Sequence, residues 1–202
     1  MHENIFHRKI TFPIYDIFTP YHNDLEYPTA FSRSFIKKDN LNPDFVSWID
    51  SLGLEVSEYS ELFFSPKNKQ YGLHKDLGID SENDSRYNQH CVKLNIIYNG
   101  QNSKMKWFAL KNGFDITNGV LPELCAVSPT NIYDEDKCVV IHEASTDGPA
   151  ELCNTIIIHT LQSGDNDRWC YSFVLHKKDT GERVSWNEAL DVFKDITEDV
   201  HS

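Results

Sequence analysis

Hydrophobic and polar residues alternate through most of the middle of the chain, and this two-residue period predicts β-strands. The clearest case is the segment 92–98, in which Val92, Leu94 and Ile96 fall on one face and Lys93, Asn95 and Ile97 fall on the other. The expected strands cover residues 54–64, 70–74, 92–98, 105–110, 138–143, 154–160 and 169–176. Many short strands separated by turns indicate an antiparallel sandwich or barrel.

Helices are expected only at the two flanks of this strand-rich region. Asn42, followed by a proline, supplies an N-cap for a helix over residues 42–52. Near the C-terminus, Ser185 and Glu188 have the spacing of a capping box, which predicts a helix over residues 185–197. The chain is therefore expected to be mainly β with flanking helices.

Turn residues predict how neighbouring strands connect. Asn99 and Gly100 have the composition of a two-residue hairpin turn, so we expect the strand at 92–98 to pair with the next strand along the chain. The length is suited to one domain with its own core. We expect a single domain over residues 1–202, with its β core at about 54–178.

The charge balance narrows the classes of partner. The chain has 19 Lys and Arg residues against 31 Asp and Glu residues, a net charge of −12. Proteins that bind nucleic acids in general need clustered cations, so we expect no such binding. Residues 1–16 have no apolar signal segment, no run is long enough to cross a membrane, and the five cysteines form no CxxC pair. These features predict a cytoplasmic protein with reduced cysteines and no membrane contact.

Two histidines stand where a metal site is expected. His74 and Asp76 are two residues apart at the end of a strand, so their side chains point to the same side. His159 stands at the end of a second apolar strand. Two imidazoles and one carboxylate on one face of a metal form the facial triad of non-haem Fe(II) oxygenases. The alternative for His74 and Asp76 is a polar turn after a strand.

Cations close to these residues in the predicted fold are candidates for binding an acidic co-substrate. Arg168 follows His159 across a short polar loop, and a hairpin there would bring its guanidinium toward the metal site. Alternatively, Arg168 is a surface cation beside Asp165 and Asp167. Lys93 and Asn95 share one face of their strand, and that face either lines the cleft or contacts solvent.

These residues together resemble a known enzyme family. His74-x-Asp76, the segment 93–95, and His159 followed by residues 168–172 resemble the Fe(II)- and 2-oxoglutarate-dependent oxygenases. The resemblance is strongest to small prolyl-hydroxylase-like and aspartyl/asparaginyl-hydroxylase-like members, and it extends over the β core. It implies a double-stranded β-helix, also called a jelly roll, which agrees with the strand pattern.

The resemblance also implies the role of each site residue. The implied Fe(II) ligands are His74, Asp76 and His159. The implied contacts to 2-oxoglutarate are Arg168 at the distal carboxylate, with Lys93 as the other candidate there, and Asn95 and Ser172 beside it. With O₂ as the second co-substrate, the implied reaction is hydroxylation of a C–H bond in a protein side chain, a peptide or a small molecule.

Two functions from other classes fit the same strand pattern. One is a non-redox, cupin-like binding module, and the other is a viral or structural jelly-roll protein that uses no metal. Iron binding and succinate release distinguish the oxygenase from both. The polar loop at residues 78–89 is expected to be a lid over the metal site or an ordinary surface connection. The sequence predicts neither the substrate nor the oligomeric state.

Overall fold

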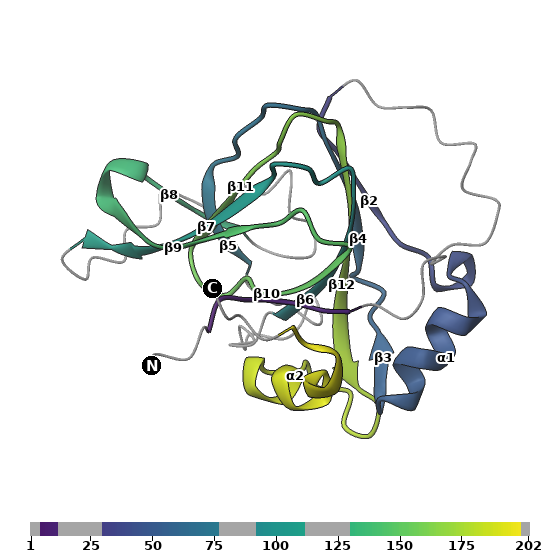
Figure 1. The fold of residues 1–202 in the computed structure, drawn as a ribbon. Coiled ribbons are helices and arrows are strands. Elements are labelled where there is room, and N and C mark those ends of the chain that lie inside the picture. The colour runs from purple at the N-terminus through teal and green to yellow at the C-terminus, as the bar shows by residue number, and fades with distance from the viewer. Residues whose placement is uncertain (1–4, 12–29, 77–91, 112–129, 199–202) are drawn as a thin grey trace.

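A computed structural model describes residues 5–11, 30–76, 92–111 and 130–198 of the chain. The described residues form a mainly β structure of two antiparallel sheets with two short α-helices (Figure 1). This arrangement agrees with the predicted antiparallel β class. No helix in the described ranges is long and apolar enough to cross a membrane.

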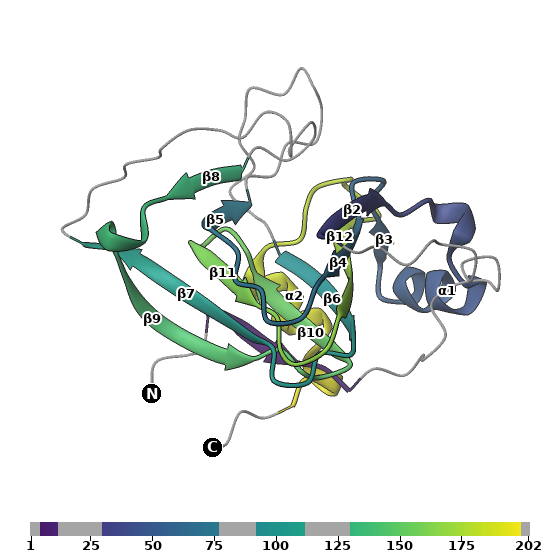
Figure 2. The same cartoon turned by 90° about the horizontal axis from the view of Figure 1, so that it is seen from above.

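The strands are divided between a larger and a smaller sheet, which Figure 2 shows from above. The seven-stranded sheet has the order β1 (His7–Lys9), β10 (Ala150–Asn154), β6 (Val92–Tyr98), β12 (Arg168–Lys177), β4 (Glu61–Ser65) and β2 (Ser32–Phe35), with β3 (Leu54–Val56) also paired to β12. The five-stranded sheet has the order β8 (Thr130–Tyr133), β5 (Leu73–Asp76), β11 (His159–Gln162), β7 (Lys104–Leu110) and β9 (Cys138–Ser145).

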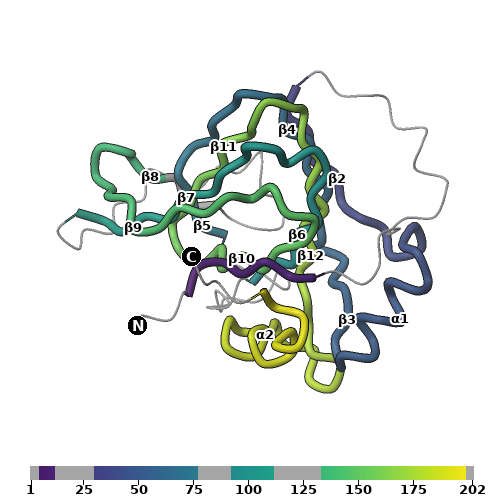
Figure 3. The backbone as a smooth tube through the Cα atoms, viewed as in Figure 1, coloured from purple at the N-terminus to yellow at the C-terminus, as the bar shows by residue number. Residues whose placement is uncertain are grey.

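The chain passes from one sheet to the other at almost every step between β4 and β12 (Figure 3). Both predicted hairpins are therefore wrong. Asn99 does adopt a positive φ of 57°, but β6 and β7 lie in different sheets. β11 and β12 also lie in different sheets, so the loop before Arg168 is a crossover. Turn residues identify where a strand ends and carry no information about which sheet the next strand enters.

Most predicted strands form, with three main differences in their limits. The strand expected at 70–74 is β5, which begins at Leu73 and continues to Asp76, while Gln70 makes only an isolated bridge to Gln162. The strand at 92–98 has the predicted bounds. The segment 54–64 is divided into β3 and β4 by a turn that contains Ser57 and Ser60, whose backbone groups hydrogen bond to each other at 3.1 Å. The segment 154–160 contains the end of β10 and the start of β11. Because residues 156–158 are all isoleucine, the sequence does not show that the chain changes sheet between these two strands.

Both predicted helices form and begin at the predicted caps. The Asn42 side chain accepts a hydrogen bond of 2.8 Å from the Asp44 amide at the start of α1 (Pro43–Ser51). Ser185 and Glu188 make both hydrogen bonds of a capping box at the start of α2 (Trp186–Val192). The second helix is shorter than predicted and continues as a 3₁₀ turn. The 3₁₀ segments are η2 (Lys38–Asn40), η4 (Glu135–Lys137) and η5 (Lys194–Ile196).

The two helices contribute to an apolar core on the outer face of the larger sheet. Phe45 of α1 lies against Phe173 of β12 with a ring centroid separation of 4.9 Å. Phe193 follows α2 and belongs to the same buried cluster as Leu94 and Leu152 of the central strands. Since strand side chains alternate in direction, this outer core leaves the other face of β6, β10 and β12 directed toward the smaller sheet.

Truncation of Phe173 tests this outer core. Phe173 is fully buried, so Phe173→Ala is expected to lower the free energy of unfolding by about 3–5 kcal/mol, because the lost contacts leave a cavity. Urea denaturation followed by circular dichroism measures the change. Phe35→Ala, which removes an aromatic ring that is 48% exposed, is the control and should change the free energy by about 0.5 kcal/mol or less. Equal losses in the two variants would contradict the packing described.

Candidate metal centre

The inner face of the larger sheet is polar although it is buried. On β6, Lys93 and Asn95 alternate with the core residues of the outer face and are 3% and 8% exposed. On β12, Arg168 and Ser172 are 3% and 4% exposed. Buried polar groups are costly unless they are paired, so a polar face of this kind is typical of a binding site.

His74, Asp76 and His159 come together at the edge of this interior. His74 and Asp76 lie on β5 in the i, i+2 relationship, and His159 is the cross-strand partner of His74 on β11. The candidate ligand atoms of the three residues all lie within 4.8 Å of one another, and the two imidazole rings have centroids 4.4 Å apart. The strand pairing therefore assembles two nitrogen donors and one carboxylate at one point.

Backbone hydrogen bonds fix how both imidazoles are presented. His74 Nδ1 lies 2.8 Å from the carbonyl oxygen of Gly72, and His159 Nδ1 lies 2.8 Å from the carbonyl oxygen of Ile157. A carbonyl only accepts, so each Nδ1 is the donor, and in a neutral imidazole held in this way Nε2 carries the lone pair. Histidines that bind metals are commonly oriented in this way by a partner of the second nitrogen.

The electrostatics of Asp76 and His159 favour the protonation states that bind metals. Burial alone would raise the pKa of the Asp76 carboxyl, but Lys93, His159 and His74 together hold it below its usual range. Burial, and after it the neighbouring His74, lowers the pKa of the His159 imidazole to about 4. At neutral pH the site therefore holds an ionised carboxylate and a neutral His159 imidazole, as metal coordination requires.

A cavity of about 150 Å³ lies beside His74 and between the two sheets. The smaller sheet contributes His74, Met105 and Leu161 to its lining. The larger sheet contributes Phe63, Ser65, Asn95, Arg168, Cys170 and Ser172, and the lining is completed by Phe31 and Tyr71. In another protein, a cavity on the order of 150 Å³ accommodates benzene, so this space is sufficient for a small organic molecule.

Several polar atoms of the cavity lining form no well-aligned hydrogen bond with the described residues. They are Arg168 Nε, Asn95 Oδ1, Ser65 Oγ and Tyr71 Oη. The polar contacts of these side chains are weak ones, between Ser65 and Tyr71, Asn95 and the Cys153 thiol, and Arg168 and the Cys170 thiol. Buried donors and acceptors are normally satisfied, and a group of unsatisfied ones around one cavity indicates space for a polar ligand. Because Arg168 supplies a permanent positive charge, the ligand that fits best is an anion with several acceptor oxygens.

The predicted co-substrate residues divide into two groups. Arg168, Asn95 and Ser172 line the cavity, and Arg168 is buried instead of standing at the surface beside Asp165. Lys93 is buried but is absent from the cavity lining. Burial raises the pKa of the Glu61 carboxyl and Lys93 opposes that rise, while Lys93 helps to hold the pKa of the Asp76 carboxyl below its usual range, so the Lys93 ammonium lies close to both carboxylates.

Sequence reasoning assigned no cavity role to Ser65 and Cys170. Ser65 is the cross-strand partner of Arg168 on β4, and Cys170 follows Arg168 by two residues on the same face. The alternation within the predicted strands 54–64 and 169–176 indicates which face each of these residues occupies. Only the pairing of the two strands shows that this face lines the cavity. The polar loop at 78–89 lies outside the described residues.

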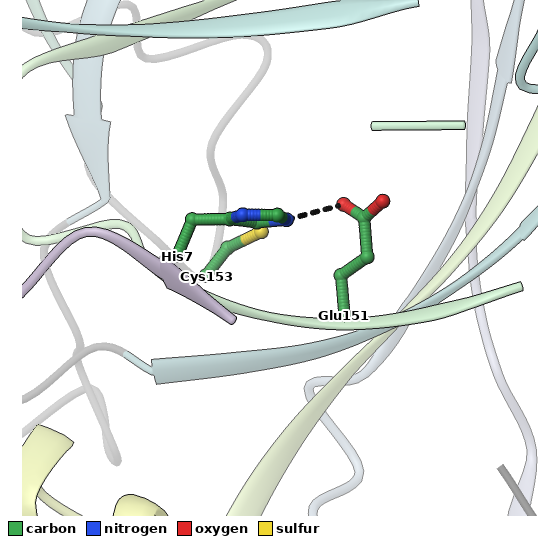
Figure 4. Close-up of side chains that lie close together, drawn as sticks. All are labelled: His7, Glu151 and Cys153. Carbon is green, nitrogen blue, oxygen red and sulfur yellow. Dashed lines mark ion pairs between the residues drawn. The ribbon is translucent and has the colours of Figure 1, made fainter. Parts of the chain in front are cut away.

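A second group of side chains that could hold a metal ion carried no signal in the sequence. His7 on β1 and Glu151 and Cys153 on β10 are buried, and their candidate ligand atoms lie within 4.8 Å of one another (Figure 4). His7 occurs in a polar terminal segment and Cys153 in an apolar one, so neither carried a sequence signal. Only the pairing of β1 with β10 brings them together.

No protein-family model matches the chain, and no curated protein is significantly similar to it in sequence.

The low pKa of His159 predicts a pH dependence of stability for the metal-free protein. An unfolded histidine has a pKa of about 6.5, so between pH 6.5 and 4 the unfolded state binds a proton that folded His159 does not bind. The free energy of unfolding should therefore fall by about 2–3 kcal/mol as the pH falls from 7 to 4.5. Urea denaturation at the two pH values measures this fall. In His159→Gln the fall should be smaller by that amount, and an unchanged fall would contradict the assignment.

Proposed function

We propose that this protein is an Fe(II)- and 2-oxoglutarate-dependent dioxygenase that hydroxylates a C–H bond of a protein side chain, a peptide or a small molecule. The observation that carries the proposal is the position of two histidines and one aspartate, whose donor atoms lie within 4.8 Å of one another, beside a cavity lined by an arginine. Iron accepts such a mixed nitrogen and oxygen donor set, and three positions stay open for co-substrates.

We further propose that the fold is a double-stranded β-helix. The eight core strands in chain order are β4, β5, β6, β7, β9, β10, β11 and β12. Numbered one to eight, they give the order one, eight, three, six in the larger sheet and two, seven, four, five in the smaller sheet. Jelly rolls are built from eight strands in two such sheets, which supports the proposal.

In the proposed site, His74, Asp76 and His159 hold Fe(II) through the two Nε2 atoms and the carboxylate. Bound iron, with 2-oxoglutarate and O₂, supplies the oxidising power for cleavage of a C–H bond. Gly72 and Ile157 hold the imidazoles through their carbonyl oxygens, so the ligands are positioned before metal binds. Lys93 balances the charge of Asp76 and so keeps the carboxylate ionised in the buried interior.

Arg168 is proposed to bind the distal carboxylate of 2-oxoglutarate. Its guanidinium lies in the larger sheet, across the cavity from His74 in the smaller sheet. A dicarboxylate in the cavity would thus be able to contact Arg168 with one carboxylate and the metal site with the other. The apolar side chains of Phe63, Met105 and Leu161 line the same space and limit the access of water.

Iron binding tests the ligand set. Wild-type protein titrated with Fe(II) and 2-oxoglutarate without O₂ should bind one iron and develop the visible absorption band of the chelate; O₂ should then yield succinate. His74→Ala and His159→Ala should lose the band, because two of three donors rarely hold Fe(II). His176→Ala, on β12 and outside the donor set, should keep it. Wild-type protein that neither binds iron nor releases succinate would overturn the proposal and favour a non-redox jelly-roll protein.

Co-substrate affinity tests the role of Arg168. Arg168→Gln should weaken 2-oxoglutarate binding by about 10–100-fold, the loss of a hydrogen-bonded charge of roughly 1.5–3 kcal/mol, while Fe(II) binding is retained. Calorimetry with Mn(II) in place of Fe(II) measures the affinity without turnover. Lys67→Gln removes an exposed cation from the loop after β4 and is the control. Unchanged affinity in Arg168→Gln would assign the distal carboxylate to another cation, with Lys93 the next candidate.

A further inference from the structure

His7, Glu151 and Cys153 repeat the arrangement of the proposed iron ligands on different strands. Glu151 and Cys153 are in the i, i+2 relationship on β10, as His74 and Asp76 are on β5. His7 is the cross-strand partner of Cys153 on β1, as His159 is of His74. In both places a histidine from a neighbouring strand completes a set of three donors on one face.

The three donors are held away from solvent. His7 is 4% exposed, and Glu151 and Cys153 are both fully buried. Figure 4 shows the His7 ring beside the Cys153 sulfur with the Glu151 carboxylate facing it. His7 Nε2 and Glu151 Oε2 are 3.2 Å apart, so the imidazole nitrogen and the carboxylate oxygen already converge.

The Glu151 carboxylate has two contacts with the protein. Its Oε1 accepts a hydrogen bond of 3.3 Å from the Gly148 amide, and its Oε2 lies 3.2 Å from His7 Nε2, an ion pair when that imidazole is protonated but without the geometry of a hydrogen bond. The nearby Lys9 ammonium forms its ion pair with Asp147, at 2.9 Å. A carboxylate buried to this degree is costly unless a cation neutralises it, and a divalent metal between the three donors would do so.

We infer that His7, Glu151 and Cys153 form a second metal site, which binds Zn(II) and fastens the N-terminal strand β1 to the larger sheet. One nitrogen, one oxygen and one sulfur donor suit zinc, and the sulfur disfavours Mg(II) or Ca(II). Ligands around tetrahedral zinc lie roughly 3.3–3.8 Å apart, so small side-chain rotations close the set. A solvent molecule would take the fourth position.

Metal binding at this site includes a proton balance. The Cys153 thiol must lose its proton to bind a metal as the thiolate. The metal–sulfur bond forms as the S–H bond breaks, and the proton passes to solvent while zinc stays divalent. Binding should therefore release at least one proton and weaken as the pH falls.

Cobalt substitution separates this site from the proposed iron site, because only this site contains a thiol. Metal-free protein titrated with Co(II) should show thiolate-to-cobalt charge-transfer absorption at one equivalent, and so should His74→Ala. The absorption should disappear in Cys153→Ser and persist in Cys138→Ser, in which another buried cysteine is changed. The absence of the band in wild type, or its persistence in Cys153→Ser, would overturn the inference, and neither result bears on iron binding.

A second variant covers the case in which Cys153→Ser does not fold. Glu151→Gln keeps the thiol and the shape of the side chain, so the charge-transfer band should persist while the Kd for Zn(II) rises at least 10-fold. Zinc should also raise the thermal midpoint of wild-type protein and slow proteolysis of the N-terminal strand, and both effects should be smaller in Glu151→Gln. An unchanged Kd in that variant would exclude Glu151 as a ligand and contradict the proposed site.

Discussion

The charges buried between the two sheets constrain the rest of the structure. Lys93 is directed into the interior from the centre of the larger sheet, where an unpaired ammonium would cost several kcal/mol. Asp76 from β5 and Glu61 from β4 both respond to its charge, and Arg33 pairs with Glu61 at 3.1 Å. A register shift of one residue in β6 would place Lys93 in the apolar core of the outer face. Charge balance and apolar packing therefore specify the same strand register.

The parts of the fold that could be predicted depend on local chemistry. In residues 92–98, Lys93 and Asn95 alternate with apolar residues, and this pattern can be recognised in the sequence without knowing which strand pairs with it. Asn42 and Ser185 form their caps with residues two or three positions away. The crossovers after Asn99 and before Arg168 could not be predicted, because pairing across sheets depends on contacts distant in sequence. The short edge strand β2 and strand β8 carry too little periodicity to be recognised.

The two groups of candidate metal ligands also differ in how far apart their residues lie in the sequence. His74 and Asp76 are close in sequence and stand at a strand end, so a common direction could be inferred, and His159 was the natural third donor. The position of Arg168 was expected from a hairpin and arises instead from a crossover, so the residue was identified for a reason that does not hold. His7 gave no signal, because its partners lie more than a hundred residues away and become neighbours only through β1 and β10.

The two sheets each form one wall of the cavity, so their separation affects which ligand lengths the cavity accepts. His74 stands on the smaller sheet and Arg168 on the larger one, so the gap between the sheets determines the distance from the metal site to the guanidinium. That gap is maintained by core side chains such as Trp107, whose indole donates to the Asn154 carbonyl of the opposite sheet at 3.0 Å. Under the proposed function, the chain length of the dicarboxylate that fits is thus a property of interior packing, and substitutions far from the ligands would alter it.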